Sequence, residues 1–431
     1  MKPIKTVSIL GANGNIGSQC AGIIAGFGNA KIYMIARDLE KSQEGIRKAI
    51  DSIKSDTIKN QLIPKTYDDL QECLPKSDWI FELVSEDFNI KQNLNNQISK
   101  YKSPQTIVST VSSGLSITKL AQSFSNQEQK YYFGTHFYNP PYKMILCELI
   151  NNPKSDPKIK KQLSEFLKNT LHRKVVETND TPGFAGNRIG FQILNEAAIF
   201  AYKYKNRGGI AFIDELLGGF TGRTMPPMET IDLVGLDIHK AIVDNIYQNT
   251  NDQAHNSFKI PKYIQNLINQ NHLGDKTKMG LYKTENNQKT VLNISQNTYE
   301  PIPKYNFNFT NLAKEKIKNA QYQEAIRLII ESTESESDIT KYFFARYISY
   351  SLSLIGKVVK KKEDIDMVMG YGFNWLPPCA LIDLLGGKNE AIKLIKHYKL
   401  LIPQVIQDQP RGKNFYTLQN ELDYRSFLRA N

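Results

Sequence analysis

The sequence predicts an N-terminal α/β domain with a mostly parallel sheet, followed by two all-α domains of similar design. Three observations lead to this fold class. Short apolar runs alternate with helical patterns over the first 180 residues, long helical patterns replace the strands after Pro182, and part of the middle region recurs near the C-terminus. Alternation of strands and helices is typical of βαβ units, which build parallel sheets. The 431 residues suffice for two to four domains of about 100–200 residues each.

The expected strands of the first domain are short apolar segments with few charges. They lie at residues 6–10, 31–36, 78–84, 106–110, 132–137 and 143–150. Amphipathic helices are expected at 16–27 and 188–204. These elements predict domains at 1–180, 181–290 and 310–431. A polar connector is expected from about 283 to 309, where Pro301 and Pro303 interrupt any helix.

The two helical regions share a motif that indicates duplication of one domain. Ile231-Asp-Leu-Val-Gly235 and Ile382-Asp-Leu-Leu-Gly386 each follow a proline pair at the same spacing, and the two pairs lie 151 residues apart. At the head of its long helix, the second copy is expected to carry Ala345-Arg346 where the first has Asn187-Arg188. Such a degenerate copy is expected to pack on the first in place of a dimer partner. The sequence therefore favours a monomer, with a homodimer as the alternative.

Composition and charge narrow the class of partner. The chain has 55 basic and 43 acidic residues, a net charge of +12, which favours an anionic ligand. It lacks a long Lys/Arg run of the kind that binds nucleic acid. Four dispersed cysteines without a CxxC pair indicate neither a zinc ribbon nor a disulfide-rich module. The long uncharged stretch 7–30 contains six glycines, unlike a membrane helix or signal peptide. We expect a soluble cytoplasmic protein with no bound metal, nucleic acid or membrane.

A glycine-rich loop follows the first expected strand and opens a helix. Glycines there let the backbone approach a pyrophosphate, which rests on the free N–H groups of the helix N-terminus. The alternative is a glycine turn that only packs helix on strand. The position between strand and helix favours a Rossmann-like dinucleotide-binding domain. Its candidate cofactor-binding residues are Gly11, Asn13, Gly14, Asn15, Ile16 and Gly17.

The second expected strand lacks the acidic residue that usually binds the adenosine ribose. It ends at Ala36, which is followed by Arg37 and Asp38. Arg37 is a candidate to bind a 2′-phosphate, which would indicate NADP. Alternatively, Asp38 reaches the ribose and Arg37 stacks on the adenine. We favour NAD as the cofactor and keep NADP as the alternative.

One histidine and one acid are candidates for proton transfer. His136 ends a strand in the segment His136-Phe-Tyr-Asn-Pro140, and Glu148 lies among apolar residues twelve positions later. A buried carboxylate needs a partner, and a histidine paired in this way has a fixed tautomer and serves as a base near neutral pH. The alternative is a purely structural contact between the two. The other five histidines lie in helical or loop contexts and are expected to be structural.

The chain resembles the L-3-hydroxyacyl-CoA dehydrogenase family over about 280 residues. The matching segments are the glycine loop, 81–91, 110–117, 136–140, Glu148, 181–188, 234–237 and 276–282. The C-terminal repeat resembles the second helical domain of multidomain fatty-acid oxidation proteins. The resemblance implies a Rossmann-like domain followed by two dehydrogenase C-terminal-type helical domains. It also implies NAD(P)-dependent oxidation of a 3-hydroxyacyl-CoA, with a separate enoyl-CoA hydratase acting in the same pathway.

The resemblance also implies a role for each matching residue. His136 is the general base and Glu148 orients it. Ser113 and Asn187 bind the substrate oxygens, and Asn139 belongs to the substrate site. Glu86 and Lys91 contact the ribose on the nicotinamide side.

Three segments depart from the family pattern. Ala36 replaces the ribose-binding acid, Val111-Ser-Ser-Gly114 replaces Asn-Thr-Ser-Ser, and Met225-Pro-Pro227 replaces Met-Gly-Pro. Two other functions remain open at this point: a dehydrogenase of a free 3-hydroxy acid, and a non-catalytic nucleotide-binding protein. The presence of both His136 and Glu148 favours an active enzyme.

Overall fold

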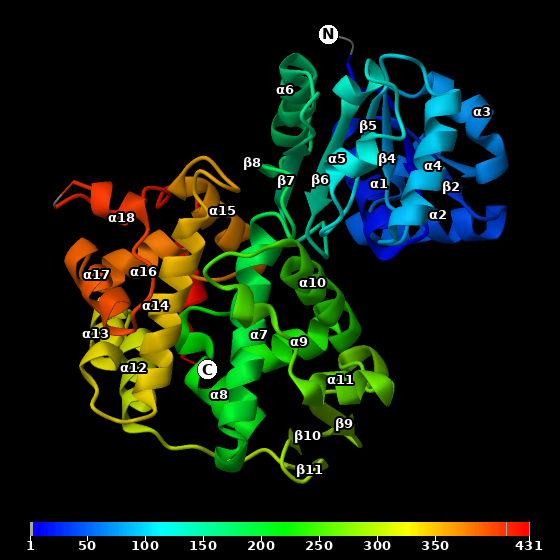
Figure 1. The fold of residues 1–431 in the computed structure, drawn as a ribbon. Coiled ribbons are helices and arrows are strands. Elements are labelled where there is room, and N and C mark those ends of the chain that lie inside the picture. The colour runs from blue at the N-terminus through cyan, green and yellow to red at the C-terminus, as the bar shows by residue number, and fades with distance from the viewer. Residues whose placement is uncertain (1–2, 411, 431) are drawn as a thin grey trace. The chain divides into compact units, whose positions relative to one another are not determined.

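The structure, a computed structural model, describes residues 3–410 and 412–430 (Figure 1). The chain forms two compact units, Met1–Phe184 and Ala185–Asn431, and each is described by itself. The first unit is built around a mostly parallel sheet, and the second is mainly helical.

Eight strands of the described first unit form one sheet in the order β3-β2-β1-β4-β5-β6-β7-β8. Neighbouring strands pair in parallel except for β6 and β7, which are antiparallel. The strands are β1 (Thr6–Leu10), β2 (Lys31–Ala36), β3 (Leu62–Thr66), β4 (Trp79–Glu82), β5 (Ile107–Thr110), β6 (Tyr132–Phe137), β7 (Leu146–Asn151) and β8 (Lys174–Thr178). The strand order reverses direction between β1 and β4. Parallel α/β sheets bind ligands at the carboxyl ends of the strands beside such a reversal.

Helices cover both faces of this sheet. They are α1 (Asn15–Gly28), α2 (Leu39–Ile53), α3 (Leu70–Cys73), α4 (Phe88–Tyr101), α5 (Ile117–Ala121) and α6 (Pro157–Glu165). Successive residues of β2 enter opposite cores: Ile32 and Met34 pack with α1, α2 and α6, whereas Tyr33 and Ile35 pack with α3, α4 and α5. Burial on both faces explains why the central strands are almost continuously apolar, which made them recognisable in the sequence.

The sequence missed the two strands at the edges of the sheet. The structure places β1, β2 and β6 at the predicted residues, but β3 and β8 were not predicted. β3 has the sequence Leu-Ile-Pro-Lys-Thr, and most of its residues are only partly buried. An edge strand pairs on one side only, so it tolerates Pro64 and Lys65 and has no strong apolar pattern.

The second unit contains two helical regions and a small sheet. Its helices are α7 (Gly186–Lys203), α8 (Gly209–Leu216), α9 (Pro227–Val234), α10 (Leu236–Asn249), α11 (Lys262–Asn269), α12 (Asn308–Lys318), α13 (Tyr322–Glu331), α14 (Ser337–Ser353), α15 (Lys362–Phe373), α16 (Pro378–Leu384), α17 (Lys388–His397) and α18 (Gln404–Asp408). Among the described helices, none is both long and apolar enough to cross a membrane.

The connector predicted at 283–309 is not simply a polar loop. Strands β9 (Tyr282–Glu285), β10 (Gln288–Asn293) and β11 (Thr298–Pro301) form an antiparallel sheet there. Asn286 and Asn287, between β9 and β10, have φ angles of 48° and 60°. Asparagine tolerates these left-handed angles, which a two-residue hairpin turn requires. The adjacent asparagines were therefore the signal that the sequence analysis missed.

Paired aspartates show the same local structure in both copies of the repeat. The carboxylate of Asp214 accepts the Met228 N–H in the first turn of α9 (2.8 Å), and that of Asp366 accepts the Cys379 N–H in the first turn of α16 (3.0 Å). Asp232 accepts two backbone N–H groups at 281–282, and Asp383 accepts two at 415–416. The repeated Ile-Asp motifs thus fix equivalent helix ends and chain segments in the two copies.

The structure corrects the predicted equivalence of Ala345-Arg346 with Asn187-Arg188. Asn187 is the second residue of α7, whereas Ala345 lies in the middle of α14. Counted from the first residue of each helix, Asp338 takes the place of Asn187. Arg188 and Arg346 therefore do not mark equivalent sites, because position in the helix, not residue type, determines which side chains correspond.

The two copies pack against each other within the second unit, where α14 lies beside α7 (Figure 1). The Leu376 N–H donates to the Gly222 carbonyl oxygen at 2.7 Å. Arg346 Nε donates to Glu196 Oε2 at 2.9 Å, and Arg188 Nε donates to the Tyr350 hydroxyl at 3.1 Å. The second copy therefore covers part of the first inside one chain.

Removal of the second copy is expected to change the state of association. Deletion of residues 310–431 exposes the apolar and charged face of α7 that α14 and α15 cover. We expect aggregation or a new dimer of the truncated chain in sedimentation velocity, and a monomer for the full chain. A truncated chain that stays a soluble, active monomer would contradict this prediction.

Candidate active site

The glycine loop between β1 and α1 is shaped to approach a phosphate. Gly11 has a φ of +83°, and a Cβ atom there would lie 2.7 Å from the Leu83 carbonyl oxygen, so a side chain does not fit. Among described side chains, none caps α1, whose N-cap is Gly14. The first N–H groups of Asn15, Ile16 and Gly17 thus lie at a helix N-terminus where an anion is favoured.

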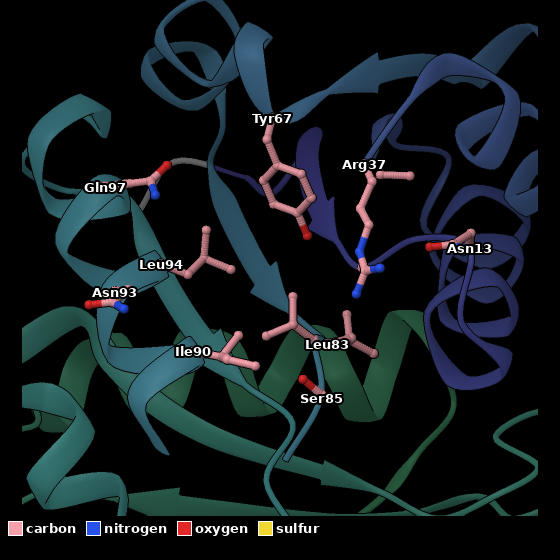
Figure 2. A pocket seen from close by; sticks show the side chains of 12 residues that line it. Asn13, Arg37, Tyr67, Leu83, Ser85, Ile90, Asn93, Leu94 and Gln97 are labelled. Carbon is pink, nitrogen blue, oxygen red and sulfur yellow. The ribbon is translucent and has the colours of Figure 1, made fainter. Parts of the chain in front are cut away.

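A cavity of about 490 Å³ opens beside this loop, at the carboxyl ends of β1, β2 and β4 (Figure 2). Its lining residues come from the glycine loop, the end of β2, the segments after β3 and β4, and α4. They are Gly11, Asn13, Ala36, Arg37, Tyr67, Leu83, Val84, Ser85, Ile90, Asn93, Leu94 and Gln97. The cavity lies at the reversal of strand order where a dinucleotide binds in this class of sheet.

The loop is also held from α2. Lys48 Nζ donates to the Asn13 carbonyl oxygen at 3.2 Å and pairs with Glu44 at 2.7 Å. Asp38 does not line the cavity; it caps α2, and its Oδ1 accepts the Lys41 N–H at 2.7 Å. Arg37, in contrast, lines the cavity.

Lys91 is a buried clamp between the ends of β4 and β5. Its ammonium group donates to both Glu82 carboxylate oxygens, at 2.9 and 3.0 Å, and neither side chain is exposed. It also donates to the Val111 carbonyl oxygen at 3.1 Å and to the Thr110 hydroxyl at 3.3 Å. These contacts hold Lys91 between the two strand ends, and its expected contact with a ribose stays a prediction.

Glu86 organises the turn after β5. Its Oε1 accepts hydrogen bonds from the Ser112 hydroxyl (2.7 Å), the Ser113 N–H (2.8 Å) and the Gly114 N–H (3.1 Å). Its other oxygen lies 4.0 Å from Lys91 Nζ. Glu86 therefore holds the turn that contains Ser113. Because its side chain is partly exposed, it is also accessible to a ligand.

His136 and Glu148 meet across the one antiparallel pair of the described sheet. The register of β6 and β7 sets them directly opposite each other, and His136 Nδ1 lies 2.8 Å from Glu148 Oε2. Both residues are buried. An ionised Glu148 accepts the Nδ1–H, which leaves the lone pair of a neutral imidazole on Nε2. This is the arrangement of a general base with an orienting carboxylate.

Tyr138 is a third member of this cluster that the sequence analysis missed. Its hydroxyl donates to the same Glu148 Oε2 at 2.8 Å, and its ring lies 4.7 Å from the His136 ring. Burial and the adjacent carboxylate raise the pKa of Tyr138 well above its usual value, so the hydroxyl stays protonated. Residues two apart in an extended chain lie on the same face, so the His-Phe-Tyr order already contained this signal.

The other predicted substrate-site residues are not all in the same unit. Ser113 lies in the turn after β5, and His136 lies near the end of β6. Because these neighbouring strands are parallel, both residues lie at the carboxyl end of the sheet. Asn139 is exposed in the turn after β6. Asn187 lies in the first turn of α7 in the second unit, three residues after Phe184. The Phe184 ring lies 5.8 Å from that of His136.

Two family models match the chain. Residues 6–181 match the model described as 3-hydroxyacyl-CoA dehydrogenase, NAD binding domain, and residues 183–284 match 3-hydroxyacyl-CoA dehydrogenase, C-terminal domain. The first matched segment contains the glycine loop, the cavity and the His136–Glu148 pair. These matches agree with the NAD cofactor that the sequence analysis favoured.

Curated relatives and solved structures extend the similarity. The chain is 31% identical to the "Probable 3-hydroxyacyl-CoA dehydrogenase" of Deinococcus radiodurans, with 66% of this chain and 84% of that protein covered. It is 28% identical to the Bacillus subtilis protein of the same description over 91% of this chain, but spans only 52% of that protein's length. In fold, the chain is similar to a 3-hydroxybutyryl-CoA dehydrogenase from Escherichia coli, with a TM-score of 0.70, 20% identity and 97% and 98% of the two chains covered.

Proposed function

Because the chain belongs to the 3-hydroxyacyl-CoA dehydrogenase family, we propose that it catalyses the reversible, NAD-dependent oxidation of a 3-hydroxyacyl-CoA to the 3-oxoacyl-CoA. The observation that carries this proposal is the 2.8 Å contact of His136 with Glu148, in the same unit as a dinucleotide-type cavity. Such a pair supplies the proton transfer that hydride removal from an alcohol requires.

The residues of the glycine loop fit a dinucleotide. The space that a Cβ at Gly11 would fill and the uncapped N-terminus of α1 suit its pyrophosphate. When bound, the cofactor supplies the acceptor for the hydride that leaves C3 of the substrate. Glu86 and Lys91 are proposed to contact the ribose on the nicotinamide side, and Lys91 also holds the strand ends beside it.

His136 is proposed to remove the proton of the 3-hydroxyl group. With the Nδ1–H donated to Glu148, the lone pair of the neutral ring lies on Nε2. As Nε2 takes the proton, the ring becomes positively charged, and the adjacent carboxylate stabilises that charge. In the reverse direction the same imidazolium donates the proton to the forming alkoxide.

Three polar residues are proposed to hold the substrate oxygens. Ser113 lies in a turn that Glu86 orders, which restricts its position. Asn187 and Asn139 are proposed as further hydrogen-bonding residues for the substrate, as the family resemblance implies. Hydrogen-bond donors placed in advance stabilise the charge that develops on oxygen in the transition state.

The same proposal gives the protein a place in fatty-acid oxidation. The substrate is the product of water addition to an enoyl-CoA, so a separate enoyl-CoA hydratase is proposed to act before it. We propose that the chain works in the cytoplasm. We also propose that it is a monomer, because the second helical copy already covers part of α7.

A comparison of matched substrates tests this function. We expect oxidation of NADH with 3-oxoacyl-CoA esters of increasing chain length. For free 3-oxo acids of the same lengths we expect a kcat/KM lower by about 10²-fold or more, because binding of the CoA moiety contributes to catalysis. Comparable rates with the free acids would favour the free 3-hydroxy acid dehydrogenase instead. The absence of turnover with every ester would contradict the proposal.

A further inference from the structure

The adenosine end of the cofactor cavity carries a positive charge and no acid. Among the described lining residues, Arg37 is the one charged side chain. Figure 2 shows its guanidinium group directed into the space between Tyr67 and Asn13. Burial raises the pKa of Tyr67 to about 12, so this hydroxyl stays neutral. The lining of the cavity therefore has a net charge of +1.

The positive charge of Arg37 is not paired with an acidic side chain in the part of the chain that the structure describes. In the described residues, the Arg37 guanidinium has no hydrogen bond or ion pair, although Asp38 is its neighbour in sequence. Asp38 is occupied as the N-cap of α2, where it accepts the Lys41 N–H. The positive charges of the nearby Lys41 and Lys48, in contrast, are both paired with the Glu44 carboxylate. Their hydrogen bonds lower the pKa of Glu44 to about 2.

The position of this charge determines what it can recognise. In a dinucleotide-binding sheet, the end of the second strand lies beside the 2′ position of the adenosine ribose. A carboxylate there binds the two ribose hydroxyls of NAD and repels a 2′-phosphate, whereas a nearby arginine accommodates that phosphate. Here β2 ends in Ala36, whose methyl group neither accepts a hydroxyl proton nor repels an anion.

We propose that Arg37 binds the adenosine 2′-phosphate, so that this chain takes NADP(H) at least as tightly as NAD(H). The planar guanidinium group donates two parallel hydrogen bonds to a phosphate, a geometry that also gives specificity. Arg37 is then the residue that determines cofactor specificity. This inference rests on the dinucleotide site of the proposed function and adds the class of dinucleotide that it accepts.

The test measures dinucleotide binding by titration calorimetry without any acyl substrate. For the unaltered chain, we expect a Kd for NADP⁺ no higher than that for NAD⁺. Arg37→Ala is expected to weaken NADP⁺ binding about 10- to 100-fold and to change NAD⁺ binding less than about threefold. Ala36→Asp is expected to weaken NADP⁺ binding by a similar factor while NAD⁺ binding is kept, because the carboxylate returns.

A matched control separates the local contact from overall charge. Arg47 is an exposed arginine of α2 outside the cavity lining, so Arg47→Ala removes the same charge and is expected to leave the ratio of the two Kd values unchanged. Raised salt is expected to weaken NADP⁺ binding more than NAD⁺ binding, because screening acts on the additional phosphate charge.

The outcomes distinguish this inference from the proposed function. Tight NAD⁺ binding with NADP⁺ more than tenfold weaker overturns the role of Arg37 and leaves the dehydrogenase proposal intact. An unchanged ratio of Kd values in Arg37→Ala has the same meaning. If neither dinucleotide binds, both the proposed role of Arg37 and the proposed dehydrogenase function are contradicted.

Discussion

Replacement of His136 by glutamine is expected to lower turnover by about 10²–10⁴-fold, with little change in the affinity for the dinucleotide. Glutamine keeps a polar side chain of similar size but cannot take up the proton of the 3-hydroxyl group. The His136 side chain contacts Glu148 and Tyr138, and it is not among the residues that line the cofactor cavity. Steady-state kinetics with the CoA ester, together with dinucleotide titration, separates the two effects.

Two further variants test how much each partner of His136 contributes to turnover. Glu148→Gln is expected to lower turnover in the same direction, because a neutral amide neither fixes the histidine tautomer nor stabilises the imidazolium. Tyr138→Phe removes only the second hydrogen bond to the same carboxylate oxygen, so a smaller loss is expected. His397→Gln, at the exposed end of α17, is the matched control with normal turnover. Near-normal rates in both the His136 and Glu148 variants would remove this pair from the mechanism.

Replacement of Lys91 by methionine is expected to destabilise the first unit by about 3–5 kcal/mol. The Glu82 carboxylate is completely buried and receives two hydrogen bonds from Lys91. Methionine fills a similar volume but leaves that carboxylate buried without its counter-charge. Thr110 and the Val84 N–H would remain as donors to Glu82, which is insufficient compensation for a buried ion.

Urea unfolding measures this effect through Trp79, which lies in β4 three residues before Glu82. The measurement uses a Trp375→Phe background in every variant, because the chain has two tryptophans. The double variant Glu82→Gln with Lys91→Met is expected to recover part of the loss, since it removes the unpaired charge. Lys76→Met breaks an exposed pair with Glu72 and is expected to have a far smaller effect. Equal decreases in the free energy of unfolding for Lys91→Met and Lys76→Met would contradict the proposed stabilisation by the buried Lys91–Glu82 ion pair.

The chain sequence alone determined the central strands, the phosphate-binding loop and the duplicated helical motif. These features depend on local chemistry. Strands buried on both faces are continuously apolar, and glycine is required where the backbone turns at Gly11. The aspartates of the Ile-Asp motifs fix helix starts that follow 14 and 13 residues later in the chain. For the same reason β3 and β8 escaped detection, because strands at the sheet edges are under weaker local constraint.

The sequence also predicted His136 and Glu148 as a pair for proton transfer, but only the tertiary structure brings them within hydrogen-bonding distance. That contact depends on the antiparallel register of β6 and β7, a pairing of non-adjacent residues that residue order does not specify. The burial of Lys91 against Glu82 and the free guanidinium of Arg37 in the cavity have the same origin. A side chain's partner is decided by which strand ends lie side by side. Strand order, set by packing of the whole sheet, therefore determined that Lys91 is buried in an ion pair whereas Arg37 lines the cavity.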